Sequence, residues 1–130
     1  KSAIKSGLKI IFCIGETLKE RRQKKTNQIL KRQIEKGLKS IKNKSKIIIA
    51  YEPVWSIGTG VIPKEADLNK TISFIKSRFI KSYPKILYGG SVNTNNVSIL
   101  KKIASIDGFL IGGASQNPKK FIDIIKKTIN

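Results

Sequence analysis

One carboxylate stands where the reactive groups of parallel α/β proteins are usually found. Glu52 directly follows the apolar run of residues 47–51 and is one of only eight acidic residues in the chain. If that run is a strand, Glu52 lies at its carboxyl end, where parallel sheets bind ligands. A carboxylate in a partly dry pocket is a good proton acceptor, so Glu52 is a candidate general base. The alternative is a strand-end charge paired with one of the many lysines.

The segment after Glu52 has the composition of a loop that closes over a ligand. Residues 53–60 begin with proline, are apolar in the middle and contain two glycines, and Pro63 follows shortly afterwards. Apolar side chains at a loop tip are unfavourable in water unless the loop packs onto something. We therefore expect residues 53–63 to form a lid beside Glu52. Trp55 is then either a lid residue or an ordinary packed aromatic.

Two pairs of glycines, Gly89–Gly90 and Gly112–Gly113, follow two further apolar runs. Because glycine has no side chain, its backbone N–H group can approach an anion closely, and the N-terminus of a following helix adds a favourable electric field. One pair alone is weak evidence, because tight turns also require glycine for backbone reasons. Two pairs in consecutive units favour a phosphate cradle.

The elements that would position these groups alternate along the chain. The apolar runs at residues 10–14, 47–51, 86–88 and 109–111 do not alternate with polar residues, which is typical of strands buried on both faces of a parallel sheet. Between and after them, apolar residues recur at helical spacing. These stripes are Leu30, Ile34, Leu38 and Ile41; Leu68, Ile72, Ile75 and Phe79; Val97, Leu100 and Ile103; and Phe121, Ile122, Ile125 and Ile129.

Three helix starts are also indicated. Residues 17–20 have the pattern of a capping box, Asn117 is a good N-cap before Pro118, and Pro63 is expected to open a helix. Four strand–helix units with parallel strands result, which leaves a small open α/β sheet or half of a (β/α)8 barrel. A complete barrel takes about 250 residues, so the 130 residues of this chain favour half a barrel.

Composition excludes several classes of protein. Hydrophobic residues make up 39% of the chain, too many for a disordered tail. With one cysteine, Cys13, and no histidine, the chain cannot build a disulfide framework, the usual zinc sites or a Ser-His-Asp triad. The net charge is +19, but the lysines are spread along the expected helices and only four basic residues are arginine. We therefore expect solvated helix faces and no specific nucleic-acid binding.

Residues 50–60 resemble the catalytic-glutamate and lid signature of the triosephosphate isomerase family. Residues 13–17, 88–92 and 107–115 resemble three further signatures of that family, in the same order and at compatible spacings. The resemblance covers essentially the whole chain, from the end of the fourth helix to the last helix. It implies an α/β fold that is the C-terminal half of a (β/α)8 TIM barrel. Residues 1–130 would form one partial domain, units five to eight, without the N-terminal half.

The resemblance also implies an activity and the residues that carry it. Glu52 would be the base that interconverts dihydroxyacetone phosphate and D-glyceraldehyde 3-phosphate through an enediolate. The substrate phosphate would be bound by backbone N–H groups of Gly58, Ser91, Gly112 and Gly113. Ile57 and Leu110 would clamp Glu52. The hinge contacts of the lid would come from Trp55 and Glu16, and Tyr88 and Ser91 would hold the closed lid.

The chain departs from the family pattern at three places. Ser56 stands where the lid tip usually has alanine, residues 61–63 differ from the commoner lid hinges, and Lys24 stands where the family often has glycine. In addition, the family's enediolate-binding lysine, asparagine and histidine come from the first four units. We therefore expect the chain alone to be inactive and aggregation-prone, with an apolar sheet face that the N-terminal half would cover.

The remaining expectations concern partners and location. The resemblance implies a triose phosphate substrate, no cofactor and no metal, a homodimer for the complete enzyme, and a cytoplasmic location without a membrane partner. Two other interpretations stay open: half of another phosphate-binding barrel enzyme, or a basic half-barrel remnant with a non-catalytic binding role.

Overall fold

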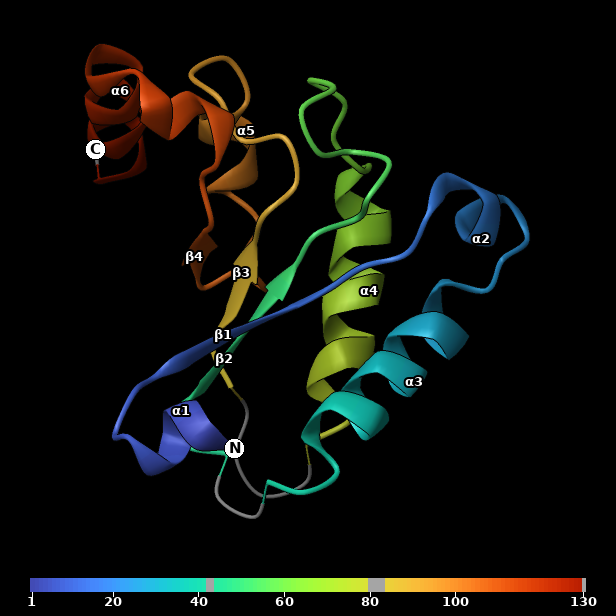
Figure 1. The fold of residues 1–130 in the computed structure, drawn as a ribbon. Coiled ribbons are helices and arrows are strands. Elements are labelled where there is room, and N and C mark those ends of the chain that lie inside the picture. The colour runs from blue at the N-terminus through green and yellow to red at the C-terminus, as the bar shows by residue number, and fades with distance from the viewer. Residues whose placement is uncertain (42–43, 80–83, 130) are drawn as a thin grey trace.

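A parallel four-stranded sheet forms the centre of the protein (Figure 1). The computed structural model describes residues 1–41, 44–79 and 84–129. The strands β1 (Ile10–Ile14), β2 (Ile47–Tyr51), β3 (Ile86–Tyr88) and β4 (Gly108–Phe109) lie side by side in chain order. The helices are α1 (Ser2–Lys5), α2 (Leu18–Arg22), α3 (Thr26–Leu38), α4 (Glu65–Lys76), α5 (Val97–Leu100) and α6 (Pro118–Ile129), with a 3-10 helix, η1 (Gly113–Gln116), before α6.

Strand order equal to chain order confirms the expected four parallel βα units. Parallel neighbours need a crossover connection, which α3 provides between β1 and β2 and α4 provides between β2 and β3. Repeated in one direction, this is the arrangement of half a (β/α)8 barrel. Within the described residues, no helix is both long enough and apolar enough to cross a membrane.

Helices α3 and α4 cover one face of the sheet. Leu30 of α3, Leu68 and Ile72 of α4 and Ile49 of β2 are fully buried and belong to one hydrophobic cluster. A Cβ at Gly37 would overlap the ring of Phe12, so glycine at this position lets α3 lie close to β1. The stripes predicted for these two helices therefore pack as expected.

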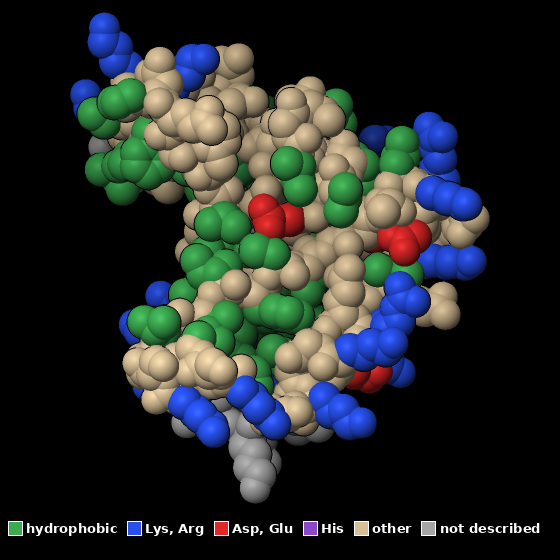
Figure 2. Space-filling view, in the orientation of Figure 1, with side chains coloured by type: hydrophobic (Ala, Val, Ile, Leu, Met, Phe, Trp, Pro, Cys, Tyr) green, Lys and Arg blue, Asp and Glu red, His purple; other side chains and the backbone are tan. Residues whose placement is uncertain are grey.

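The opposite face of the sheet is open. Ile11 is 47% exposed, Cys13 is exposed, and Ile48 and Leu87 are partly exposed. Figure 2 shows hydrophobic side chains gathered over the strands, with Lys and Arg side chains around the rim. The expectation of strands buried on both faces is thus wrong for β1, because no element of the described chain covers this side. The exposed apolar face was expected of half a barrel.

One predicted strand and one predicted stripe differ from the structure. Strand β4 spans Gly108–Phe109 where residues 109–111 were expected. Within α6, all of which the structure describes, Ile124 is buried, whereas Ile122, Ile125 and Ile129 of the predicted stripe are exposed. The helix packs mainly against α5 and η1, which leaves these three isoleucines largely exposed.

The helix starts follow from local hydrogen bonds. Thr17 Oγ1 accepts from the N–H of Glu20, and Glu20 Oε2 accepts from the N–H of Thr17, which confirms the capping box. Asn117 Oδ1 accepts from a backbone N–H in the first turn of α6, at 3.1 Å. Pro63 does not open a helix: Lys64 is still extended, with ψ 144°, and α4 begins at Glu65. Acidic residues in that first turn favour the start there.

Candidate active site at the carboxyl ends of the strands

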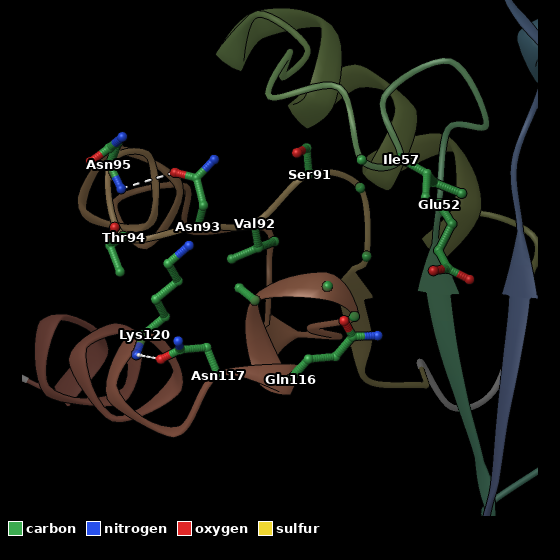
Figure 3. Close-up of a pocket in the computed structure, with 16 residues that line it drawn as sticks. Glu52, Ile57, Ser91, Val92, Asn93, Thr94, Asn95, Gln116, Asn117 and Lys120 are labelled. Carbon is green, nitrogen blue, oxygen red and sulfur yellow. Dashed lines mark hydrogen bonds between the residues drawn. The ribbon is translucent and has the colours of Figure 1, made fainter.

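The predicted site residues converge at one end of the sheet. A cavity of about 680 Å³ lies at the carboxyl ends of β2, β3 and β4 (Figure 3). Of the site residues named from the sequence, eight line it: Glu52, Ile57, Gly58, Gly89, Gly90, Ser91, Gly112 and Gly113. Glu16, Trp55, Tyr88 and Leu110 do not belong to its lining. Trp55 belongs to the lid, and Glu16 and Tyr88 contact lid residues, as described below.

Glu52 continues directly from the end of β2. Its N–H donates to the carbonyl of Ile14 at 2.8 Å, so the residue is held by the ladder between β1 and β2. The side chain is partly buried and rests on Gly89, where a Cβ would lie 2.6 Å from Glu52 Cγ and 3.0 Å from Oε1. Figure 3 shows Glu52 and Ile57 on the same side of the cavity. Gly89 therefore makes room for the carboxylate.

Cys13 is a neighbour of Glu52 that the sequence did not single out for the site. Although the residue is exposed, partial desolvation of the thiol, followed by the hydrogen bond and the negative charge of Glu52, raises the pKa of Cys13 to about 11. The thiol therefore stays protonated at neutral pH. The strand register was the available signal, because Cys13 pairs with Ala50, two residues before Glu52.

The two glycine pairs have different surroundings. A Cβ at Gly90 would overlap Tyr88 Oη and lie 2.7 Å from Ser56 Oγ. Because Gly89 lies against Glu52, both glycines of the first pair are crowded. A Cβ at Gly112 or Gly113 would meet nothing within 4 Å, so their backbone is open to the cavity. None of these four described glycines has a positive φ. Left-handed backbone geometry, the alternative reason for glycine, therefore does not apply here.

The lid, residues 53–63, is tied to the loop that follows β3. The N–H of Gly60 donates to Ser91 Oγ at 2.9 Å, and Ser56 Oγ lies 2.9 Å from Tyr88 Oη. Ser91 N–H donates to Ser56 Oγ at 3.3 Å, so this N–H points at the lid and not into the cavity. Ile57 at the lid tip is 50% exposed, as expected for an apolar tip that packs onto a ligand. The burial of Tyr88 raises its pKa, which keeps the hydroxyl protonated.

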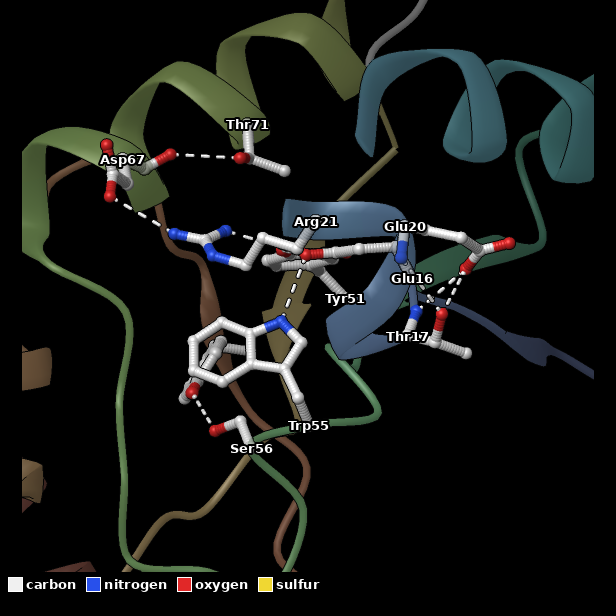
Figure 4. Close-up of polar contacts among 10 residues, drawn as sticks. Glu16, Thr17, Glu20, Arg21, Tyr51, Trp55, Ser56, Asp67 and Thr71 are labelled. Atoms are coloured by element: carbon white, nitrogen blue, oxygen red, sulfur yellow. Dashed lines mark hydrogen bonds and ion pairs between the residues drawn. The ribbon is translucent and has the colours of Figure 1, made fainter. Parts of the chain in front are cut away.

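A buried carboxylate anchors the first part of the lid (Figure 4). Glu16 is fully buried and accepts hydrogen bonds from Tyr51 Oη at 3.1 Å and from Trp55 Nε1 at 3.1 Å. Arg21 Nη1 lies 3.5 Å from Glu16, and its guanidinium carbon lies 4.7 Å from the centroid of the Trp55 ring. Arg21 also pairs with Asp67 at 3.1 Å. Buried carboxylates require such partners.

These contacts favour one of the two interpretations of Trp55. The indole N–H of Trp55 donates to the Glu16 carboxylate, and the Arg21 guanidinium lies over its ring. Trp55 is therefore more than a packed aromatic. Burial, and then the charge of Glu16, raises the pKa of Tyr51, which therefore remains a donor. The sequence did not point to Tyr51 or Arg21, although an arginine in a lysine-rich chain was an available signal.

Several polar residues of the cavity were also missed. Asn93, Asn117 and Lys120 line it, and Lys120 extends toward the loop that follows β3 in Figure 3. Nothing in the sequence distinguishes Lys120 from the other lysines. Among residues 1–41, 44–79 and 84–129, no group of three or more His, Cys, Asp or Glu side chains could hold a metal ion.

The fold and this site together define parallel βα units that carry a carboxylate, a lid and an open glycine pair around one cavity. The family model for triosephosphate isomerase matches residues 1–128. A triosephosphate isomerase of Thermodesulfovibrio yellowstonii is 45% identical over 131 residues, which cover 96% of this chain and 53% of the relative. Those of Mycoplasma mobile and Saccharomyces cerevisiae are 46% and 43% identical and cover 95% and 96% of this chain, with 51% and 53% of their own length.

The chain therefore belongs to the triosephosphate isomerase family, a family of glycolytic enzymes. It spans about half the length of the curated relatives that it matches.

Proposed function

We propose that this chain supplies the base, the lid and the phosphate-binding half of a triosephosphate isomerase. The reaction is the interconversion of dihydroxyacetone phosphate and D-glyceraldehyde 3-phosphate. One observation carries the proposal: Glu52, the lid residues Ile57 and Gly58, and the open pair Gly112–Gly113 line a single cavity. A carboxylate in the same cavity as an open glycine backbone suits proton transfer on a small phosphorylated substrate.

In this proposal each part of the cavity has a separate task. The N–H groups of Gly112–Gly113 and Gly58 bind the substrate phosphate, and Glu52 removes a proton from the carbon next to the carbonyl. Glu52 then returns the proton to the former carbonyl carbon, while the hydroxyl proton passes from one oxygen of the enediolate to the other through a donor of the partner half, so the reaction is a net isomerisation. Ile57 and Leu110 would shield the carboxylate from water while the lid is closed.

The proposal includes a partner. Removing a proton beside a carbonyl leaves a negative charge on oxygen, which must meet preorganised donors. The chain contains no histidine, and the family takes these donors from its first four βα units. We propose that those units also cover the open face that bears Ile11 and Cys13, and that the 130 residues alone are inactive. The complete enzyme would be a cytoplasmic homodimer, as in the family.

The test combines this chain with a polypeptide that carries the first four βα units of the Thermodesulfovibrio yellowstonii relative. We call the product the assembled barrel. In it, Glu52→Gln should lower kcat by about 1,000-fold, because general-base catalysis contributes 10²–10⁴-fold. Binding of phosphoglycolate, an enediolate analogue, should remain detectable. The matched control is Glu35→Gln, an exposed carboxylate on α3, which should leave both quantities unchanged.

Two outcomes would contradict the proposal. Loss of analogue binding in Glu52→Gln, with the fold intact, would mean that Glu52 binds the ligand and does not transfer a proton. An assembled barrel that binds arbitrary DNA in a salt-sensitive way, but not phosphoglycolate, would favour the basic-remnant alternative.

A further inference from the structure

The Ser56 side chain is buried beneath the lid with every hydrogen-bonding position of its hydroxyl occupied. Ser56 has no exposed surface, and its Oγ donates to the carbonyl of Val61 at 2.5 Å. Because a hydroxyl has one proton and two acceptor positions, the remaining contacts must be donated to it. Tyr88 Oη, at 2.9 Å, and the N–H of Ser91, at 3.3 Å, are these donors.

The partners of this hydroxyl come from both sides of the lid boundary. Val61 lies in the last part of the lid, Tyr88 ends β3, and Ser91 lines the cavity. The hydroxyl therefore joins the first part of the lid to its last part and both to the frame around the cavity. Ser91 adds a second tie, since its Oγ accepts from the N–H of Gly60.

The surrounding backbone leaves space for this contact. A Cβ at Gly90 would overlap Tyr88 Oη and lie 2.7 Å from Ser56 Oγ. The alanine that is usual at position 56 in the resembling family has no hydroxyl. Alanine would leave the buried Tyr88 hydroxyl and the Val61 carbonyl without this partner, which is unfavourable for buried polar groups.

We propose that the Ser56 hydroxyl is the latch that holds this lid over the Glu52 cavity. The proposal rests on the proposed function, and it makes Ser56 a positioning residue that acts through Tyr88 and Ser91. Closure places Ile57 and Gly58 over the substrate, so an unlatched lid weakens ligand binding. The contacts of Ser56 are to the lid and its frame, and Glu52 keeps its own support on Gly89.

The test is a double-mutant cycle between Ser56→Ala and Tyr88→Phe in the assembled barrel. Each single variant should lower kcat/KM and phosphoglycolate affinity by about tenfold, because a net hydrogen bond of this kind is worth about that much. The double variant should lose little more than either single variant, since both remove the same contact. Ser105→Ala, which removes a hydroxyl bonded to Asn69 of α4 and not to the lid, should change neither quantity.

A KM-against-kcat split separates a latch from a stability effect. Loss through a latch raises KM and weakens analogue binding, whereas general destabilisation lowers the unfolding midpoint and leaves both unchanged in the folded fraction. Unchanged kcat/KM and affinity in Ser56→Ala would overturn the latch. Full additivity of the two substitutions would overturn it as well.

Failure of the proposed function would be recognised separately, as an unsubstituted assembled barrel that does not isomerise triose phosphates. In that case the latch is judged by amide hydrogen exchange at Gly60 and Ser91. Faster exchange at both amides in Ser56→Ala, with unchanged exchange in Ser105→Ala, supports the latch. Equal exchange in all three proteins overturns it.

Discussion

The two glycine pairs look alike in the sequence, but they lie in opposite environments. Gly89–Gly90 follows β3 and is crowded, because the Glu52 side chain and the hydroxyls of Ser56 and Tyr88 occupy the space where side chains would be. Both pairs line the cavity, but at Gly112–Gly113, after β4, a Cβ would meet no atom within 4 Å. A glycine pair after a strand can therefore make room for side chains of the protein or leave a backbone accessible to a ligand. The surroundings of the pair, and not the Gly-Gly sequence itself, determine which of these two roles it has.

The crowded pair should give the largest effect. In Gly89→Ala the new Cβ would lie 2.6 Å from Glu52 Cγ, so the carboxylate must move. We expect kcat of the assembled barrel to fall by about 100-fold, the cost of misplacing a reacting group by about 1 Å. Phosphoglycolate affinity should fall less, because the phosphate contacts lie elsewhere. Steady-state kinetics and analogue titration measure the two quantities.

Cys13 reports on the same displacement independently of activity. Its pKa of about 11 depends in part on the hydrogen bond and charge of Glu52. This measurement uses the 130-residue chain without the partner half, in which Cys13 is exposed. If the carboxylate moves away in Gly89→Ala, this pKa falls, and alkylation by iodoacetamide reaches half its maximal rate at lower pH. An unchanged alkylation profile together with unchanged kcat would show that Gly89 does not position Glu52.

The open pair should respond in a different way. In Gly113→Ala the new Cβ meets no protein atom within 4 Å, so the unfolding midpoint should not change. The methyl group instead occupies space at the cavity, and we expect KM and the dissociation constant of phosphoglycolate to rise by about tenfold, the loss of about one hydrogen bond to a charged group. Thermal unfolding and analogue titration decide between these effects. Destabilisation with normal affinity would mean that this pair is structural too.

The difference between the pairs also marks the limit of what the sequence could predict. Local patterns predicted β1, β2, β3 and the Thr17 capping box correctly, because hydrophobic runs and caps depend on neighbours in the chain. The space around Gly89 depends on Glu52, which is 37 positions away, and so requires the packed structure.

Other misses have a similar cause. The buried face of α6 was wrong because its neighbours decide which isoleucines are covered, and Ile124 alone of the described α6 residues is buried. Arg21 joins Glu16, Asp67 and Trp55 through a fold that brings α2, α4 and the lid together. Pattern recognition found the motif residues, whereas the partners that hold them came from three-dimensional contacts.

Backbone torsion is a third reason for glycine, and Lys24 is the position at which to test it. The expected change in stability is the smallest of those predicted here. Among the residues that the structure describes, Lys24 is the one non-glycine residue with a positive φ, at 58°, and it lies in the turn between α2 and α3. Such a torsion costs an L-residue about 1–2 kcal/mol, and the greater freedom of glycine when unfolded offsets part of the gain. Lys24→Gly should therefore raise the free energy of unfolding by about 0.5 kcal/mol, measured by urea denaturation of the assembled barrel. Lys36→Gly, the same substitution within helix α3, should lower it by about 1 kcal/mol. Equal destabilisation by both substitutions would show that the torsion at position 24 carries no strain.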